Sequence, residues 1–494
     1  MALKVVSENQ QFIDALPQAL QSEVLDRLEA LMKLSNPVPW QQVDAQLQLI
    51  KVIAASPFSA QIFLLNPQLL DHALLTKRVS KPQLKRLLMA DMQEVTNETQ
   101  LHQSLRQFRK AHQVRLIWRN RCGLGSSEQL VEDLSNLADV CVDLALTWLH
   151  DDSVKQWGQP TNRDGQPQEL VVLGMGKLGG KELNLSSDID LIFSFPAPGE
   201  TQGGRRSLDN QQFFIRLGQR LIQAIDAVTA EGFVFRVDMR LRPYGASGAL
   251  ALSFDAMEIY YQQQGREWER YAFVKARVIA GNQAPGQQLL ELLRPFVYRK
   301  YLDYSAIESL RSLKQMIASE VRRRGLEQNV KLGTGGIREV EFIAQAFQLI
   351  RGGRDNRLQT SSLMAVLDVL PETAGLASSD VEKLRTGYWF LRDVEHALQA
   401  VHDTQTQDLP SQEADQARLA VALGYSCWDS LQAQINTTRD FIHQQFELVV
   451  ALKEDNDSQG LDHQLSQLWA EISHSAHQTD ELTLLPDWQQ RLSQ

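Results

Sequence analysis

Residues 169–195 read ELVVLGMGKLGGKELNLSSDIDLIFSF. The stretch begins with a short apolar run from Leu170 to Leu173, and glycines follow it at positions 174, 176, 179 and 180. From Asp188 to Phe195, apolar side chains then largely alternate with polar ones. A buried run, a cluster of glycines and an alternating run together predict a strand, a glycine turn and a second strand.

Two carboxylates share one face of the predicted second strand. Side chains two residues apart on a strand point the same way, so Asp188 and Asp190 lie side by side. Adjacent carboxylates repel each other, and burying them without compensation is costly, so the pattern predicts solvent or a cation between them. Ligands that are all oxygen atoms suit Mg²⁺ or Mn²⁺.

A third carboxylate lies in residues 232–243, GFVFRVDMRLRP. Alternation in this segment predicts a strand whose apolar face carries Phe233, Phe235, Val237, Met239 and Leu241. The other face carries Val234, Arg236, Asp238, Arg240 and Arg242. Placed beside the first pair, Asp238 would complete a metal site, while the guanidinium groups would bind phosphate oxygens. Phosphoryl and nucleotidyl transfer need both carboxylates that bind metal and cations that bind phosphate.

Length and composition limit the possible classes of protein. A chain of 494 residues predicts roughly three domains. The net charge of −10 argues against a nucleic-acid partner, although twelve arginines between residues 201 and 300 make the middle of the chain the expected anion-binding part. The three cysteines lack metal-site or disulfide spacing, and no long apolar segment occurs. We therefore expect a cytoplasmic protein without a membrane span.

The pattern along the chain predicts a predominantly helical α+β fold. We expect an N-terminal helical domain at residues 1–160, a catalytic core with a small mixed sheet at 161–284, and a helical bundle at 285–453. Residues 454–494 are acidic and are expected to be a linker and the start of a following module. We accordingly expect the chain to be the N-terminal portion of a longer protein that continues past Gln494.

Several charged segments outside the carboxylates remain open to two interpretations. The basic helix from Leu105 to Arg121 is expected to be a solvated surface. His396 and His402 are also expected at the surface. A helical stretch from Gly265 to Arg277 places Arg277 on one face with two other arginines, for surface ion pairs or for phosphate binding.

Residues 331–342, KLGTGGIREVEF, contain three glycines before a helix predicted to begin near Ile337. Free N–H groups at that helix start could bind an anion together with Lys331 and Arg338. The competing interpretation is that Glu339 and Glu341 simply suit the positive end of the helix dipole.

The glycine turn, the Asp188 and Asp190 pair and the later Asp238 resemble the nucleotidyltransferase superfamily that includes beta-type DNA polymerases. The resemblance is closer to the glutamine synthetase adenylyltransferase family, whose blocks appear in order in four segments. These read GMGKLGGKELNLSSDIDLIF from Gly174, VDMRLRPYGASG from Val237, GREWERYAFVKAR from Gly265 and KLGTGGIREVEF from Lys331. The resemblance spans roughly residues 100 to 450.

The resemblance implies two catalytic halves in one polypeptide, one that attaches AMP to a tyrosine of glutamine synthetase and one that removes it. This chain has one copy. Four features resemble the N-terminal, AMP-removing half. They are the serines before Asp188, the loop at Thr201–Arg206, an initiator Met before a helical domain, and the acidic tail. The resemblance implies three partners for this chain: an adenylyltransferase half that follows it in the polypeptide, the PII signal protein as regulator, and glutamine synthetase as substrate.

The implied reaction is phosphorolysis, in which inorganic phosphate attacks adenylyl-O-tyrosine and gives ADP. The metal ligands would be Asp188, Asp190 and Asp238. The expected nucleotide and phosphate ligands are Gly176, Lys177, Ser187, Arg240, Arg242, Lys275, Arg277, Lys331 and Arg338. Lys177 stands where the superfamily usually has serine, which leaves the phosphate-binding role open between Lys177 and Ser187. Three alternatives stay open: the ATP-dependent adenylylating half, a PII-type uridylyltransferase, and a non-catalytic binding module. The paired His-Asp hydrolase motif of PII-type uridylyltransferases is not seen in this sequence.

Overall fold

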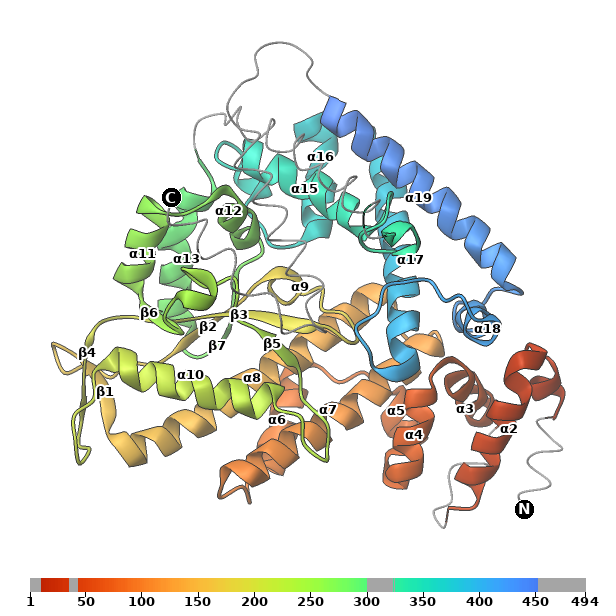
Figure 1. The fold of residues 1–494 in the computed structure, drawn as a ribbon, viewed down its shortest axis with the longest axis horizontal. Coiled ribbons are helices and arrows are strands. Elements are labelled where there is room, and N and C mark those ends of the chain that lie inside the picture. The colour runs from red at the N-terminus through yellow and green to blue at the C-terminus, as the bar shows by residue number, and fades with distance from the viewer. Residues whose placement is uncertain (1–9, 35–42, 300–322, 324, 452–494) are drawn as a thin grey trace.

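The structure is a computed structural model that describes residues 10–34, 43–299, 323 and 325–451 (Figure 1). The expected acidic tail at 454–494 lies outside the described residues. Within them, helices dominate and a small mixed sheet occupies the middle of the molecule, as the sequence predicts for a predominantly helical α+β protein.

The N-terminal part is helical up to residue 157, as predicted. Prolines mark several helix starts: Pro57 and Pro82 lie in the first turns of α4 and α6, where a missing N–H costs nothing. The helices are α2 (Gln18–Met32), α3 (Val43–Ala55), α4 (Pro57–Leu65), α5 (His72–Thr76), α6 (Lys81–Asp91), α7 (Glu98–Arg121) and α8 (Ser127–Trp157).

A five-stranded mixed sheet forms the core that holds the predicted carboxylates. Its order is β7, β2, β3 and then β5, while β6 pairs with the other end of β3. The strands are β2 (Val171–Gly174), β3 (Asp188–Phe195), β5 (Arg236–Asp238), β6 (Ala251–Ser253) and β7 (Arg277–Ala280), and β1 (Gln159–Asn162) pairs separately with β4 (Gly199–Gln202). The predicted strand, glycine turn and strand are confirmed, and the turn contains a single helical turn, α9 (Gly176–Gly179).

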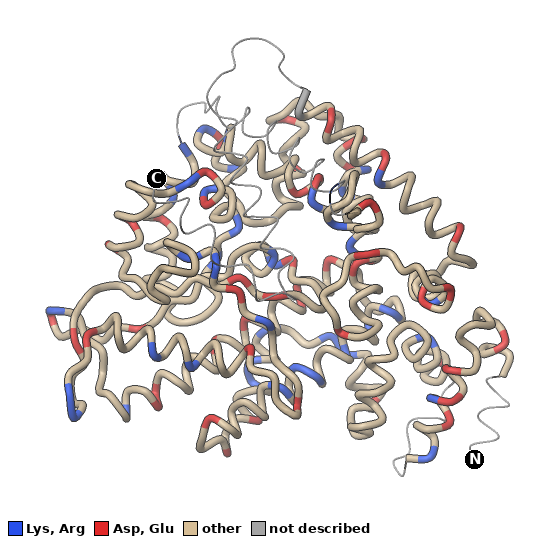
Figure 2. Tube along the Cα trace, viewed as in Figure 1, with Lys and Arg blue, Asp and Glu red and all other residues tan. Residues whose placement is uncertain are grey.

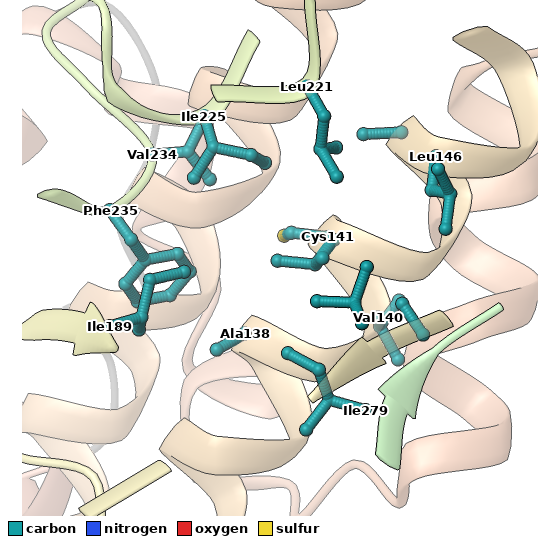
Figure 3. Close-up of a cluster of buried hydrophobic side chains, with 14 of the residues drawn as sticks. Ala138, Val140, Cys141, Leu146, Ile189, Leu221, Ile225, Val234, Phe235 and Ile279 are labelled. Atoms are coloured by element: carbon teal, nitrogen blue, oxygen red, sulfur yellow. The ribbon is translucent and has the colours of Figure 1, made fainter. Parts of the chain in front are cut away.

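Helices cover both faces of this sheet. On one face, Ile189 of β3 packs with residues of α8 and of α10 (Asn210–Asp226), as the labelled side chains of Figure 3 show. On the other face, Val171 and Ile192 pack with α11 (Phe254–Gln263), α12 (Glu267–Phe273) and α13 (Gln283–Val297). The sheet is therefore rigidly held, and its strand ends can present polar groups at fixed positions.

The C-terminal helices form their own core, and one of them also reaches the sheet region. They are α15 (Ile337–Arg351), α16 (Leu363–Ala374), α17 (Ser378–His402), α18 (Glu413–Ala422) and α19 (Trp428–Ala451). The long helix α17 contacts α4, α8 and α3 as well as its own bundle, and in Figure 1 it runs between the upper and lower helices. This position places α17 next to the glycine turn.

Three local predictions are corrected. The Asp238 strand spans only three residues, because the chain turns at Met239, where Arg242 caps the carbonyl group. Arg277 begins a strand and not a helical face. The segment expected to be a loop at Thr201–Arg206 begins within a strand, β4.

The basic helix is the largest correction. Four of its arginines are buried: Arg106, Arg109, Arg115 and Arg119. Arg106 donates to the carbonyl oxygens of Ala224, Ala227 and Gly232, which lie at and beyond the end of α10. His396, predicted at the surface, is also buried. Helical periodicity identified the charged faces but not the segments that cover them.

Among the described residues, no single helix is long and apolar enough to span a membrane. The one helix pair that reaches that length and hydropathy together, Asp44–Ala55 and Pro57–Leu65, is bent by 116°.

We expect Arg106→Met to destabilise the fold by about 3 kcal/mol, because it leaves several buried carbonyl groups without a donor. The matched control is Lys110→Met on the same helix, which removes a partly exposed ion pair with Glu231 and should cost less than about 1 kcal/mol. Urea unfolding of both variants checks this. Equal midpoints for the two variants would contradict the structural role of Arg106.

Candidate active site at the β3 and β5 carboxylates

The glycine turn fits directly against the carboxylate of Asp190. Gly176 has a φ of +52°, which favours glycine, and a Cβ built on it would lie 2.7 Å from Oδ2 of Asp190. The backbone N–H of Met175 donates to the carbonyl oxygen of Asp190 at 2.9 Å. Gly176 is thus required for the close approach of turn and strand, and this is how the predicted residue contributes to the site.

Strand pairing brings the three predicted carboxylates together. β3 and β5 are parallel, and Asp190 is the register partner of Asp238, while Asp188 is the partner of Arg236. Burial raises the pKa of Asp190 well above its ordinary value, Asp188 and Asp238 raise it further, and Lys331 and Arg240 oppose the rise. The electrostatics therefore agree with the register: three acids share one small region.

Each of the three carboxylates is in a different bonding state. Asp238 is held by Arg240, whose Nε donates to its two carboxylate oxygens at 2.8 and 3.0 Å. Oδ1 of Asp188 accepts hydrogen bonds from Ser187 at 3.2 Å and Gln405 at 3.0 Å. Within the described residues, the Asp190 carboxylate has no side-chain or backbone donor.

The donor set fits Mg²⁺ or Mn²⁺, because it consists of carboxylate oxygens and because Asp190 and Oδ2 of Asp188 accept no hydrogen bond from the described chain. No ready-made cluster of three metal-binding side chains occurs in the described ranges. Both carboxylate oxygens of Asp238 accept hydrogen bonds from Arg240.

Two of the predicted cations lie at the carboxylates. Arg240 binds Asp238, and Lys331 is close enough to oppose the rise in the Asp190 pKa. The Lys331 ammonium makes no hydrogen bond or ion pair with the part of the chain that the structure describes, and it is partly exposed. Lys331 and Arg240 are therefore the predicted cations best placed to meet an anion at this site.

Three other predicted cations are occupied by the protein itself. Arg242 donates to the carbonyl oxygens of Met239, Ala246 and Gly248. Arg277 binds both carboxylate oxygens of Asp139 at 2.8 and 3.0 Å and the carbonyl groups of Leu178 and Gly179. Lys275 donates to Glu182 at 2.8 Å and to Glu341 at 3.3 Å, and these acids outweigh burial and raise its pKa. The structure does not bring Arg277 or Lys275 to the carboxylates, whereas Arg242 lies near enough to Asp238 to feel its charge while its hydrogen bonds go to backbone carbonyl groups.

The second glycine segment binds its own backbone. At the start of α15, the N–H groups of Ile337, Arg338 and Glu339 donate to the carbonyl oxygens of Val330, Lys331 and Gly336. The predicted free N–H groups are thus occupied. Arg338 lies beside Tyr271 and Glu341, and burial lowers its pKa to about 10. The contribution of this segment to the site is Lys331.

Lys177 points away from the carboxylates and towards α17. Its Nζ donates to Asn184 and to Glu395, each at 3.2 Å. Burial and nearby Arg392 lower its pKa to about 7 in spite of Glu395. Although burial alone would raise the pKa of Glu395, Lys177 and Arg392 hold it below its ordinary value. This ion pair links the glycine turn to the C-terminal bundle, and Figure 2 shows basic and acidic residues together in this central region.

Sequence reasoning missed the partners that α17 and its following segment supply. Arg392 and Glu395 are fully buried, and Arg392 binds Asn184 and the carbonyl oxygen of Glu182, beside the glycine turn. The sequence did contain a pattern that could have identified the residues on α17. Arg392, Glu395 and Gln399 recur at helical spacing, so they form a polar stripe on an otherwise apolar helix face. Gln405 carried no such signal.

The sequence of this chain matches two protein-family models and several curated proteins. Residues 46–292 match the family model of glutamate-ammonia ligase adenylyltransferase, and residues 311–450 match that of the GlnD PII-uridylyltransferase. The chain is 52% identical over 461 residues to the bifunctional glutamine synthetase adenylyltransferase/adenylyl-removing enzyme of Pseudomonas putida, covering 92% of this chain and 46% of that protein.

The protein of the same name from Hahella chejuensis is 49% identical over 407 residues, covering 82% of this chain and 42% of the relative. The chain spans about half the length of the curated relatives it matches.

We expect Asp190→Asn to abolish activity while raising thermal stability at neutral pH. A carboxyl group whose pKa is raised in the folded state stabilises the fold below its unfolded pKa of ~3.9 and loses that contribution as pH rises. The gain in melting temperature without added metal should therefore be present at pH 7 and shrink towards pH 4. The matched control is Asp164→Asn in an exposed turn. A marked drop in melting temperature for Asp190→Asn alone would indicate a structural role.

Proposed function

Because the chain belongs to the glutamate-ammonia ligase adenylyltransferase family, we propose that its β3 and β5 carboxylates catalyse transfer of an AMP group at a tyrosine of glutamine synthetase. The direction we propose is removal, in which inorganic phosphate accepts the AMP and ADP is formed. One observation carries the chemistry: Asp190 and Asp238 are register partners, with Asp188 two residues away on the same strand.

In the proposed reaction, a phosphate oxygen attacks the phosphorus of adenylyl-O-tyrosine and the bond from phosphorus to the tyrosine oxygen breaks. The phenolate leaves and takes a proton from solvent. Because a tyrosine hydroxyl has a pKa of ~10, this departure needs little help from a general acid. A bound Mg²⁺ or Mn²⁺, held by Asp188, Asp190 and Asp238, would supply charge neutralisation at the phosphoryl oxygens.

The cations of the site support an anionic co-substrate. Lys331 presents an ammonium group to the carboxylate region without a partner in the described chain, and Arg240 presents a guanidinium group there. Arg240 has a second role, because it neutralises Asp238 when no metal does so. We infer that Arg240 exchanges Asp238 for the incoming phosphate as the metal binds, so that two cations face the nucleophile.

The adenylylating direction uses the same carboxylates, and the names of the relatives include both activities. We infer that the site described here acts beside a second, adenylylating half in the full-length protein. The match of residues 311–450 to the PII-uridylyltransferase model supports the PII signal protein as a regulator that acts on α15–α19. The three free cysteines support a reducing, cytoplasmic location.

The direction is tested with adenylylated glutamine synthetase, phosphate and Mn²⁺. We expect ADP to form at a rate that saturates with phosphate, because a bound nucleophile occupies a definite pocket. Free AMP as the product, formed at a rate independent of phosphate, would mean hydrolysis. Incorporation of labelled AMP from ATP into unmodified glutamine synthetase by this chain alone would reverse the assignment.

The two cations give a second prediction. Lys331→Gln and Arg240→Lys should each raise the KM for phosphate several-fold, and turnover should fall as well if the contact strengthens in the transition state. Arg242→Lys is the matched control, since the hydrogen bonds of Arg242 with the described residues go to backbone carbonyl groups, so its loss should affect stability more than KM. An Arg242→Lys variant with the largest rise in KM would place the phosphate elsewhere.

A further inference from the structure

The segment from Asp403 to Leu409, which we call the strap, follows α17 and passes the carboxylate site. It begins with Asp403 in the left-handed region, at φ 53°, which is uncommon for a residue other than glycine. A backbone held in this conformation requires surroundings that fix it. The contacts of Asp403 supply such surroundings.

The first anchor of the strap is a buried ion pair. Arg109 of α7 binds the two carboxylate oxygens of Asp403 at 2.7 and 2.9 Å, and both side chains are at most 7% exposed. Gln113, one turn further along α7, donates to the same carboxylate at 2.8 Å. Because the guanidinium and carboxylate groups meet at two points, this anchor fixes both position and orientation.

Asp403 is also hydrogen-bonded to Ser186, which lies just before β3. The hydroxyl group of Ser186 donates to the carbonyl oxygen of Asp403 at 3.0 Å and accepts a hydrogen bond from Arg236 of β5 at 3.0 Å. The backbone N–H of Ser186 donates to Gln399 of α17 at 2.9 Å. The strap therefore starts from a point that is fixed relative to both carboxylate strands.

The second anchor lies beyond the carboxylates and joins the strap to the segment that carries Lys331. The N–H of Val330 donates to the carbonyl oxygen of Gln407 at 2.9 Å, and the N–H of Leu409 donates to the carbonyl oxygen of Gln328 at 3.1 Å. Asn329 donates to the carboxylate of Asp408 at 2.8 Å. The strap thus spans from the start of β3 to the predicted phosphate ligand.

Between these two anchors, Gln405 reaches the site. Its Nε2 donates to Oδ1 of Asp188 at 3.0 Å. Two donors, Gln405 and Ser187, now engage the same oxygen, while Oδ2 accepts no hydrogen bond from the described residues. A carboxylate held in this way keeps one rotamer and presents its other oxygen in a constant direction.

From this geometry we propose that Gln405 is a positioning residue for metal binding and that the strap makes the catalytic carboxylates depend on the C-terminal helices. The inference rests on the proposed function, because it assigns Asp188 a metal to bind. Among the described residues, the side chain of Gln405 hydrogen-bonds to Asp188, so we infer that it acts by orienting this ligand. Hydrogen-bond donors behind metal ligands typically change metal affinity or activity by about 10–100-fold.

The test is Mn²⁺ binding to the intact chain, measured by the electron paramagnetic resonance signal of free Mn²⁺. Gln405→Ala should weaken the affinity roughly 10-fold or more. Its melting temperature without metal should stay close to the wild-type value, because Gln405 is partly exposed. Gln407→Ala is the matched control: it removes the same side chain from the same strap, and among the described residues Gln407 makes its hydrogen bond through its backbone carbonyl group.

Wild-type affinity in Gln405→Ala, or an equal loss in Gln407→Ala, would overturn the role of Gln405 while leaving the proposed function intact. A wild-type chain without affinity for Mn²⁺ would overturn the metal site and the strap together. If Gln405→Ala is unstable, Gln405→Asn replaces it, because the amide remains but is one methylene group too short to reach Asp188. Retained affinity in that variant also counts against the proposal.

Discussion

The parallel pairing of β3 with β5 is the constraint on which the rest of the structure depends. It places Asp190 opposite Asp238, with Asp188 nearby, in a region where burial and mutual repulsion disfavour three negative charges. Neighbouring side chains offset this repulsion. Arg240 neutralises Asp238, Gln405 and Ser187 donate to Asp188, and Asp190 is left open.

The need to hold these groups explains why a small sheet is surrounded by so much helix. The glycine turn gains its partners from α17, through Lys177 with Glu395 and through Arg392 with Asn184. The arginines of α7 cap backbone carbonyl groups and anchor Asp403. Charges that are buried must be paired, so these contacts determine how α7 and α17 pack against the core. The site is consequently supported by α7, α17 and the strap as well as by the sheet.

The carboxylates were predictable from the sequence because their relation is local: period-two spacing fixes the face of Asp188 and Asp190, and the alternation around Asp238 indicated a neighbouring strand. The cations were less predictable, since an arginine can bind a backbone carbonyl group as well as a phosphate and its position in the sequence does not say which it binds. Arg242 and Arg277 bind carbonyl groups, although Arg242 lies near Asp238, while Arg240 binds Asp238 directly and Lys331 acts on Asp190. Gln405 lies 217 residues from Asp188, and no periodicity spans such a distance.

We propose that Asp188, Asp190 and Asp238 together bind a divalent cation. Anomalous X-ray diffraction from crystals of this chain grown with Mn²⁺ and a non-hydrolysable nucleotide would locate that cation. We expect one or two anomalous peaks about 2.0–2.3 Å from oxygens of all three carboxylates, with Arg240 released from Asp238. A chain without any such peak, or one in which Arg240 still binds Asp238 while Mn²⁺ lies at other acids, would contradict this proposal.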